Sequence, residues 1–133
     1  MVFKKIAAQA QEKTAKASTI AQEKIDALID EFNTMLPFME ELGLSVASFD
    51  IEAGLIPQIQ TSLVGSIDNI QDEAVKRLIV EHQTNKLLVG VLNAILTSKK
   101  IHQRLEGAYI SVLKNLIIDI KLGLPPSISC RFQ

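Results

Sequence analysis

Hydrophobic residues recur along the chain with two different spacings, which divide it into four predicted segments. In residues 3–35, and again from about residue 68 past residue 96, they return every three or four positions, as on one face of an amphipathic helix. In residues 45–64 and 112–132 they alternate with polar residues, as in half-buried strands. The pattern therefore predicts a helix, two strands, a second helix and two more strands.

The two strand segments contain the same short phrase. Residues 50–63 and 119–132 share Asp, Ile, Gly, Leu, Pro and Ile at matching positions, and both reach a Gly-Leu-x-Pro turn. An alternating run on each side of a turn predicts a β-hairpin. Because each hairpin follows a helical segment, the chain divides into half-repeats of residues 1–66 and 67–133, which suggests internal duplication. The residues expected to face inward are Ala47, Phe49, Ile51, Ala53, Ile59 and Leu63 in the first hairpin, and Ile118, Ile120, Leu122, Ile128, Cys130 and Phe132 in the second.

Pro and Gly set the predicted ends of the helical segments. Pro37 lacks a backbone donor and clashes with the preceding turn, so we expect a kink or a restart near Leu36. Gly43 is predicted to end the last turn in the left-handed conformation. Asp68 or Asp72 is expected to cap the second helix, which ends between residues 105 and 113.

These segments predict one two-layer α+β domain of order αββαββ, spanning residues 1–133, with a four-stranded antiparallel sheet covered on one face by two long helices. A helix of about 33 residues is roughly 50 Å long, and strands of eight to ten residues span roughly 30 Å, so part of each helix extends past the sheet. The N-terminal overhang presents mainly Ala, which suits close helix packing, and we expect a homodimer or higher homo-oligomer. The candidate interface residues are Ile6, Ala10, Ala17, Ile20, Ala21, Leu88, Val91, Leu92 and Ile95.

Composition narrows the classes of partner and compartment. The net charge is −1 and the chain has no Trp and one Tyr, so it offers neither the positive field nor the stacking aromatics of a nucleic-acid binder. The most hydrophobic run, residues 87–96, is about half the length of a bilayer span and predicts a buried helix segment. Cys130 is the single cysteine, so the chain has no internal disulfide framework, which favours a cytoplasmic location. Because Cys130 lies on the apolar side of the predicted last strand, we expect its thiol to be buried and inert.

Residues that could carry chemistry are sparse. His82 and His102, the two histidines, are twenty positions apart, about 30 Å along a straight helix, and cannot share a metal ion within one chain. The sequence contains no His-Glu-x-x-His or Cys-x-x-Cys motif and no Gly-rich phosphate loop. A serine nucleophile needs a base, which two widely separated histidines supply poorly. We therefore expect no catalytic residue, no metal and no cofactor.

Two surfaces could have either an ordinary structural role or a binding role. The outward face of the sheet is expected to be solvated, with recognition as the alternative. The first 24 residues hold more lysine than glutamate, which suits anionic lipid, but their apolar face is mostly Ala, so helix pairing is expected rather than membrane binding. The polar residues of the outward face are Asp50, Glu52, Gln58, Gln60, Asp119, Lys121, Ser129 and Arg131.

Two functions remain open on the sequence. The first is a non-catalytic self-associating module that acts as a scaffold or protein-interaction domain. The alternative is a carrier of a lipid or other apolar ligand, with a membrane-surface association as its variant, in which the ligand lies between helices and sheet. The candidate pocket residues for this alternative are Phe32, Phe49, Ile51, Leu92, Ile118 and Ile120.

Overall fold

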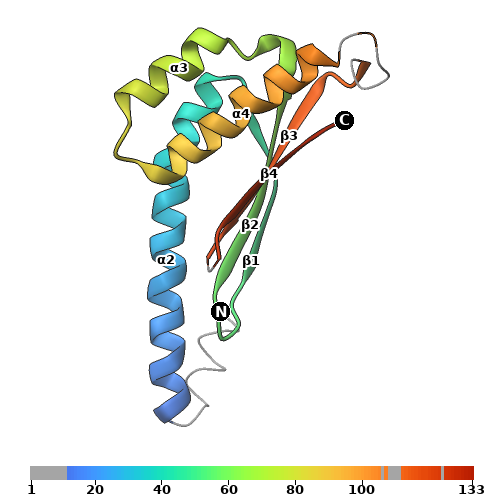
Figure 1. Cartoon of the computed structure of the whole chain (residues 1–133). Coiled ribbons are helices and arrows are strands. Elements are labelled where there is room, and N and C mark those ends of the chain that lie inside the picture. Colours follow the sequence, from blue (N-terminus) through green and yellow to red (C-terminus); the bar gives the residue numbers. More distant parts are fainter. Residues whose placement is uncertain (1–11, 106, 108–111, 124) are drawn as a thin grey trace.

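In the part of the chain that the structure describes, three α-helices and a four-stranded antiparallel sheet build an α+β fold (Figure 1). The computed structural model describes residues 12–105, 107, 112–123 and 125–133, and the side chains of the first helix from residue 22 onward. The elements are α2 (Glu12–Glu41), β1 (Ser45–Glu52), β2 (Gln58–Ser66), a 3₁₀ turn (Ile67–Asn69), α3 (Asp72–Glu81), α4 (Lys86–Arg104), β3 (Asn115–Leu122) and β4 (Ser127–Phe132). The predicted α+β class and both hairpins are confirmed.

The second predicted helix is two helices, so the order is αββααββ rather than αββαββ. The α3 helix ends where the backbone N–H of His82 donates to the carbonyl of Leu78, at 3.0 Å. The α4 helix begins after Asn85, whose side-chain oxygen accepts from the backbone N–H of Leu88 at 3.1 Å. Because this cap satisfies a free amide of a new helix, the four residues 82–85 divide the segment.

The ends of α2 and α3 test the predicted caps and break. Gly43, at φ 90°, closes α2 as predicted, with its N–H bonded to the carbonyl of Glu40 and that of Leu44 to the carbonyl of Met39. The predicted restart before Pro37 is wrong, because α2 continues through Pro37 to Glu41. The predicted caps Asp68 and Asp72 are also wrong: Gln71 precedes α3 and makes no side-chain capping bond.

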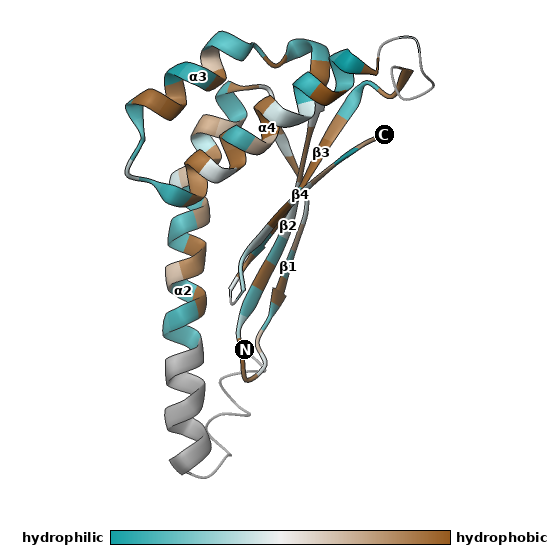
Figure 2. Ribbon diagram, viewed as in Figure 1, coloured by the Kyte–Doolittle hydropathy of each residue, from teal (hydrophilic) through white to brown (hydrophobic). Residues whose placement is uncertain are grey.

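The sheet is a meander in which β1 and β4 form the two edges. Hydrophobic and hydrophilic residues alternate along its strands (Figure 2). The buried core fills the space between the inward face of the sheet and the three helices. Its members are Phe32, Met35, Met39, Leu42, Leu44, Ile59, Leu63, Ile67, Ile70, Val75, Leu78, Leu88, Val91, Leu92, Ile95, Leu116, Ile118, Ile120 and Leu122.

The predicted burial of one face of β1 is wrong, because every residue of this strand is exposed. The helices pack mainly α2 on β2 and α4 on β4, and the contact of Phe32 on α2 with Phe49 leaves Phe49 38% exposed. A bulge at Ala47 also shifts the strand, which places Val46 rather than Ala47 opposite the inward-facing Leu63. Ala53, also predicted to face inward, lies beyond the end of β1 and is exposed.

Candidate functional site

The inner side of β1 and the β1–β2 turn form an exposed apolar surface. Val46, Phe49 and Ile51 are 41%, 38% and 52% exposed although they belong to the same face of the sheet as the core. In the turn, Leu55 is fully exposed and Ile56 is more than half exposed. We call these five residues the β1 apolar edge. Exposed apolar residues gathered on one edge strand are typical of a surface that binds another protein.

A hydrogen bond from the core fixes the bulge beside this edge. Thr61 is buried on the inner face of β2, and its hydroxyl donates to the backbone carbonyl of Ser48 at 2.8 Å. The hydroxyl thereby supplies a partner to a carbonyl at the point where the β1–β2 register is irregular. The bulge is therefore held in place by the core.

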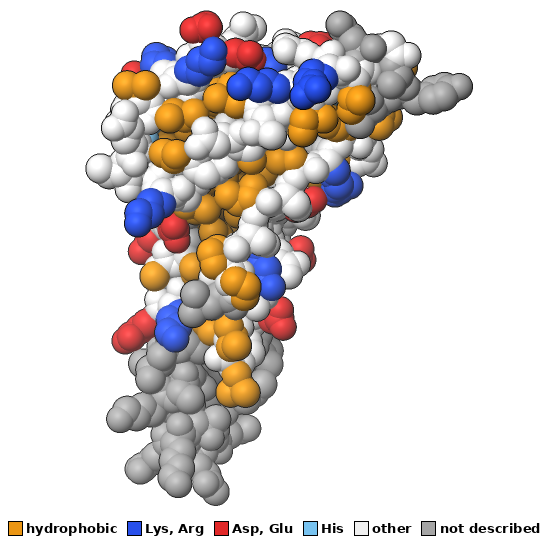
Figure 3. Space-filling view, viewed as in Figure 1, with side chains coloured by type: hydrophobic (Ala, Val, Ile, Leu, Met, Phe, Trp, Pro, Cys, Tyr) orange, Lys and Arg blue, Asp and Glu red, His pale blue; other side chains and the backbone are white. Residues whose placement is uncertain are grey.

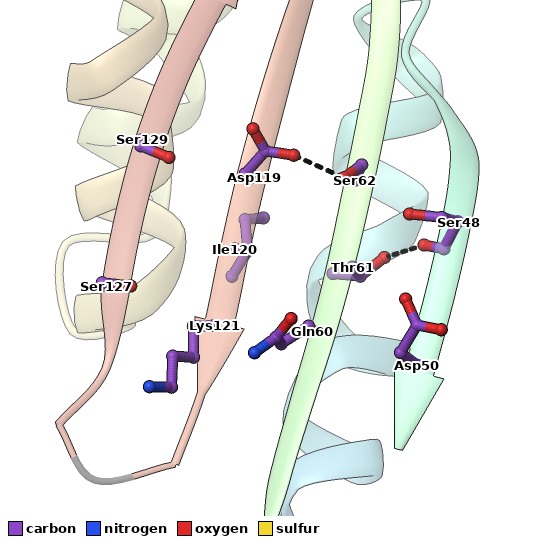
Figure 4. Close-up of a pocket in the computed structure, with 10 residues that line it drawn as sticks. All are labelled: Ser48, Asp50, Gln60, Thr61, Ser62, Asp119, Ile120, Lys121, Ser127 and Ser129. Carbon is purple, nitrogen blue, oxygen red and sulfur yellow. Dashed lines mark hydrogen bonds between the residues drawn. The ribbon is translucent and has the colours of Figure 1, made fainter. Parts of the chain in front are cut away.

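The outward face of the sheet forms a shallow polar hollow of about 280 Å³ (Figure 4). The hydroxyl of Ser62 donates to Asp119 at 2.5 Å, and the Nε of Arg131 lies 3.0 Å from the other carboxylate oxygen. The hydrogen bond from Ser62, and then that from Arg131, lower the pKa of Asp119 below its ordinary value. These contacts tie β2, β3 and β4 together. The residues that line the hollow are Ser48, Asp50, Gln60, Thr61, Ser62, Asp119, Ile120, Lys121, Ser127 and Ser129, which include five of the residues predicted for this face.

A second hollow, of about 380 Å³, lies between α2, the start of α4 and the β3–β4 turn. Figure 3 shows hydrophobic side chains in the recess below α4. Two charged residues, Glu31 and Lys86, stand beside the apolar ones in the lining. We call this hollow the α2–α4 groove. It is lined by Leu28, Glu31, Lys86, Leu87, Leu122, Gly123, Pro126, Ser127 and Ile128, and none of the residues predicted for an apolar-ligand pocket is among them.

The predicted pocket residues separate into core and surface. Phe32, Leu92, Ile118 and Ile120 are buried in the core, whereas Phe49 and Ile51 belong to the β1 apolar edge. The one link between the two sets that the structure shows is an aromatic contact, with the rings of Phe32 and Phe49 5.2 Å apart. The six residues are therefore divided between the core and the β1 apolar edge.

The predicted interface residues fall into three groups. The residues from the second helical segment, Leu88, Val91, Leu92 and Ile95, are fully buried on α4 inside the core of a single copy. Ile6 and Ala10 lie outside the described residues, as do the side chains of Ala17, Ile20 and Ala21 on α2. The contribution of the N-terminal helix to an interface stays a prediction.

One histidine and the cysteine lie between α4 and β4. His102 is buried, its ring is 5.1 Å from that of Phe132, and its Nε2 lies 3.0 Å from the carbonyl oxygen of Leu113. Burial raises the pKa of the Cys130 thiol, an effect that a hydrogen bond with Ser98 partly offsets. A thiol with a raised pKa is a poor nucleophile, because the thiolate is the reactive form. This cluster is therefore accounted for by packing.

Neither a metal cluster nor a membrane helix is found in the part of the chain that the structure describes. No three or more His, Cys, Asp or Glu residues within it are placed to hold a metal ion. None of its helices is both long and apolar enough to cross a bilayer. Comparisons with protein-family models, with curated proteins and with solved structures gave no match to this chain.

Proposed function

We propose that this protein is a non-catalytic, self-associating module that works as a scaffold or protein-interaction domain in the cytoplasm. The observation that carries the proposal is the β1 apolar edge, where five hydrophobic side chains are exposed on an edge strand and its turn. Proteins usually protect such an edge with charges, a bulge or a covering segment. Here a bulge interrupts only the first part of β1, and the apolar residues beyond it are accessible.

The size of this surface sets what association can gain from it. Fully burying a Val, Phe or Ile side chain gains roughly 1.5–3 kcal/mol, and the three β1 side chains are 38–52% exposed. Covering them completely would contribute about 2–4 kcal/mol. A micromolar complex needs about 8 kcal/mol, so the hydrophobic contact requires further interactions along the edge.

Sedimentation velocity over the micromolar range tests the proposal. We expect a mass above 14.6 kDa, the mass of a single chain, and we expect this measured mass to fall on dilution. The variant Ile51→Lys, which places a charge in the apolar edge, should shift the protein toward monomer. Val80→Lys is the matched control, because Val80 is 67% exposed but lies on α3. A wild-type chain that stays monomeric at the highest concentration would refute self-association.

A second function, binding of an apolar ligand, is favoured by the α2–α4 groove. Its volume of about 380 Å³ is within the range of small-molecule sites, and five of its lining residues, Leu28, Leu87, Leu122, Pro126 and Ile128, are apolar. The charged Lys86 at its margin would suit the carboxylate of a fatty acid. Here the ligand would lie beside the core rather than between the buried residues named from the sequence.

Titration with a fluorescent fatty acid tests this second function. We expect Leu87→Glu to weaken binding, because it places a like charge next to the carboxylate in an apolar lining. Leu55→Glu is the control, since Leu55 is exposed in the β1–β2 turn. Equal binding by both variants would show that the fatty acid does not enter the groove.

A further inference from the structure

The two edges of the sheet carry opposite charge on the outward face. On β1, Asp50 and Glu52 point outward and the strand contains no basic residue. On β4, Arg131 points outward, 57% exposed, and the strand contains no acidic residue. Arg131 already contacts Asp119 of its own chain, but it has further N–H donors at its exposed end. The charge on β1 is therefore complementary to the charge on β4, and neither edge is complementary to a second copy of itself.

Pairing of β1 with a second β1 would set like charges together. If the regular part of the strand, Ser48 to Glu52, paired with itself in antiparallel register, Asp50 would lie directly opposite its counterpart. Like charges at directly opposed positions destabilise a strand pair. The acidic residues therefore disfavour a symmetric β1–β1 dimer in this register.

The helical layer is offset toward β4, which leaves room beside the inward face of β1 for a second copy of the chain. The α4 helix packs on β4 and α2 packs on β2, while the inward-facing Val46, Phe49 and Ile51 of β1 stay 38–52% exposed, Phe49 despite its contact with Phe32 of α2. Four strands are roughly 19 Å wide across the sheet, and two packed helices are roughly 16–20 Å wide. Because these widths match, the sheet and the helical layer can both continue with the same spacing from one copy to the next. The α4 helix of one copy would then lie next to the uncovered side of the neighbour's β1.

We infer that copies of this chain associate head to tail, with β4 of one copy pairing antiparallel with β1 of the next, so that a single sheet runs through the assembly. The inference rests on the proposed self-association and names its surfaces. Two free edges on one chain make the contact heterologous, so the assembly adds copies without closing into a symmetric dimer.

One register satisfies both faces of the new strand pair. With Arg131 opposite Asp50 of the next copy, Phe132 lies opposite Phe49 and Cys130 opposite Ile51. Charge then meets charge on the outward face, and apolar residues meet on the inward face. This part of β1 lies past the bulge, so the backbone is free to continue the ladder. The ladder hydrogen bonds supply the interactions that apolar burial alone does not.

A charge exchange tests this pairing. Asp50→Lys and Arg131→Glu should each raise the dissociation constant by about two- to thirtyfold, because an opposed ion pair becomes a repulsive one. An equimolar mixture of the two variants should regain wild-type association, since every contact in an alternating assembly then joins opposite charges. Arg131→Gln is an intermediate control that removes the charge without reversing it. A symmetric β4–β4 dimer would instead survive Asp50→Lys, and a β1–β1 dimer would survive Arg131→Glu.

Cross-linking tests the register independently. In Ile51→Cys, the new thiol would lie opposite Cys130 of the next copy, at the spacing of directly paired residues that a disulfide can bridge. Oxidation with diamide should give a ladder of linked chains on a non-reducing gel, and Asn93→Cys, exposed on α4, should not. If the wild type is oligomeric but Ile51→Cys forms no ladder and the charge variants associate normally, the β4–β1 pairing is wrong while the proposed self-association stands. A monomeric wild type overturns the proposed function with it.

Discussion

Replacing Leu92 by Ala separates a core role for the apolar face of α4 from a role in contacts between copies. Leu92 is fully buried in the core of one chain. The substitution removes three carbon atoms, which costs about 2.4 kcal/mol in transfer free energy at roughly 0.8 kcal/mol each. Because the surrounding core relaxes only partly, the remaining cavity raises the expected loss of unfolding free energy to about 3–5 kcal/mol.

Urea denaturation of the purified variant measures this loss, and a thermal melt should show a midpoint lower by roughly 10–20 °C. The matched control is Ile101→Ala on the same helix, which should cost about 1 kcal/mol or less because Ile101 is 46% exposed. The reasoning fails if Leu92→Ala keeps wild-type stability but dissociates the protein, since Leu92 would then face another copy.

Three further predictions concern close packing, a partly buried ion pair and acid stability. Gly65→Ala should cost about 1–3 kcal/mol in a denaturant titration, because the added Cβ would lie 2.8 Å from a methyl of Leu44, whereas Gly54→Ala, with nothing within 4 Å, should cost nothing measurable. Lys99→Met should cost about 1–3 kcal/mol in the same assay, because Lys99 is 12% exposed, contacts Asp72 at 2.5 Å and donates to the carbonyl of Ile70. Lys100→Met, at an exposed position, is the control and should leave the stability unchanged. Asp119 has a lowered pKa, so its stabilisation is complete above its ordinary value of 3.8 and is lost as the pH falls through the folded value; melts of Asp119→Asn should lack that acid-side dependence.

The hairpins were predictable because the strand period is a local property of the sequence. In β2 and β3 the alternation of Ile59 with Gln60, and of Ile118 with Asp119, matches the faces that the structure gives them. Gly43 was predictable for the same reason, since a left-handed turn after a helix needs a residue without a side chain. Signals of this kind do not depend on what packs against them.

The division between α3 and α4 was missed because the hydrophobic spacing continues across it. Leu78 and Leu88 belong to the core on both sides of the break, as they would on one continuous helix. The available signal was Asn85, a preferred N-cap residue placed just before an apolar run. An N-cap residue in the middle of a segment with helical spacing therefore predicts a new helix as strongly as the spacing predicts a continuous one.

The candidate surfaces were harder to predict because hydrophobic pattern does not say what covers a residue. Phe49 alternates with polar neighbours just as Ile120 does, yet Phe49 stays 38% exposed whereas Ile120 is buried. Likewise, Leu92 is as hydrophobic in a core as it would be between two copies, so its pattern fitted both interpretations. Which strand becomes an edge, and which helix face closes the core, are decided by tertiary packing.

A core that closes within one copy implies that association and folding are separate events. Met35, Met39, Leu88 and Ile95 are fully buried without any contribution from another chain, whereas the residues of the β1 apolar edge stay exposed. Dissociation should therefore yield a folded monomer, and Asp50→Lys should unfold within about 0.5 kcal/mol of the wild type when both are diluted to monomer. Circular dichroism of the diluted variant measures this. Loss of helical signal on dissociation would mean that neighbouring copies complete the fold, and that the edge is part of a shared core.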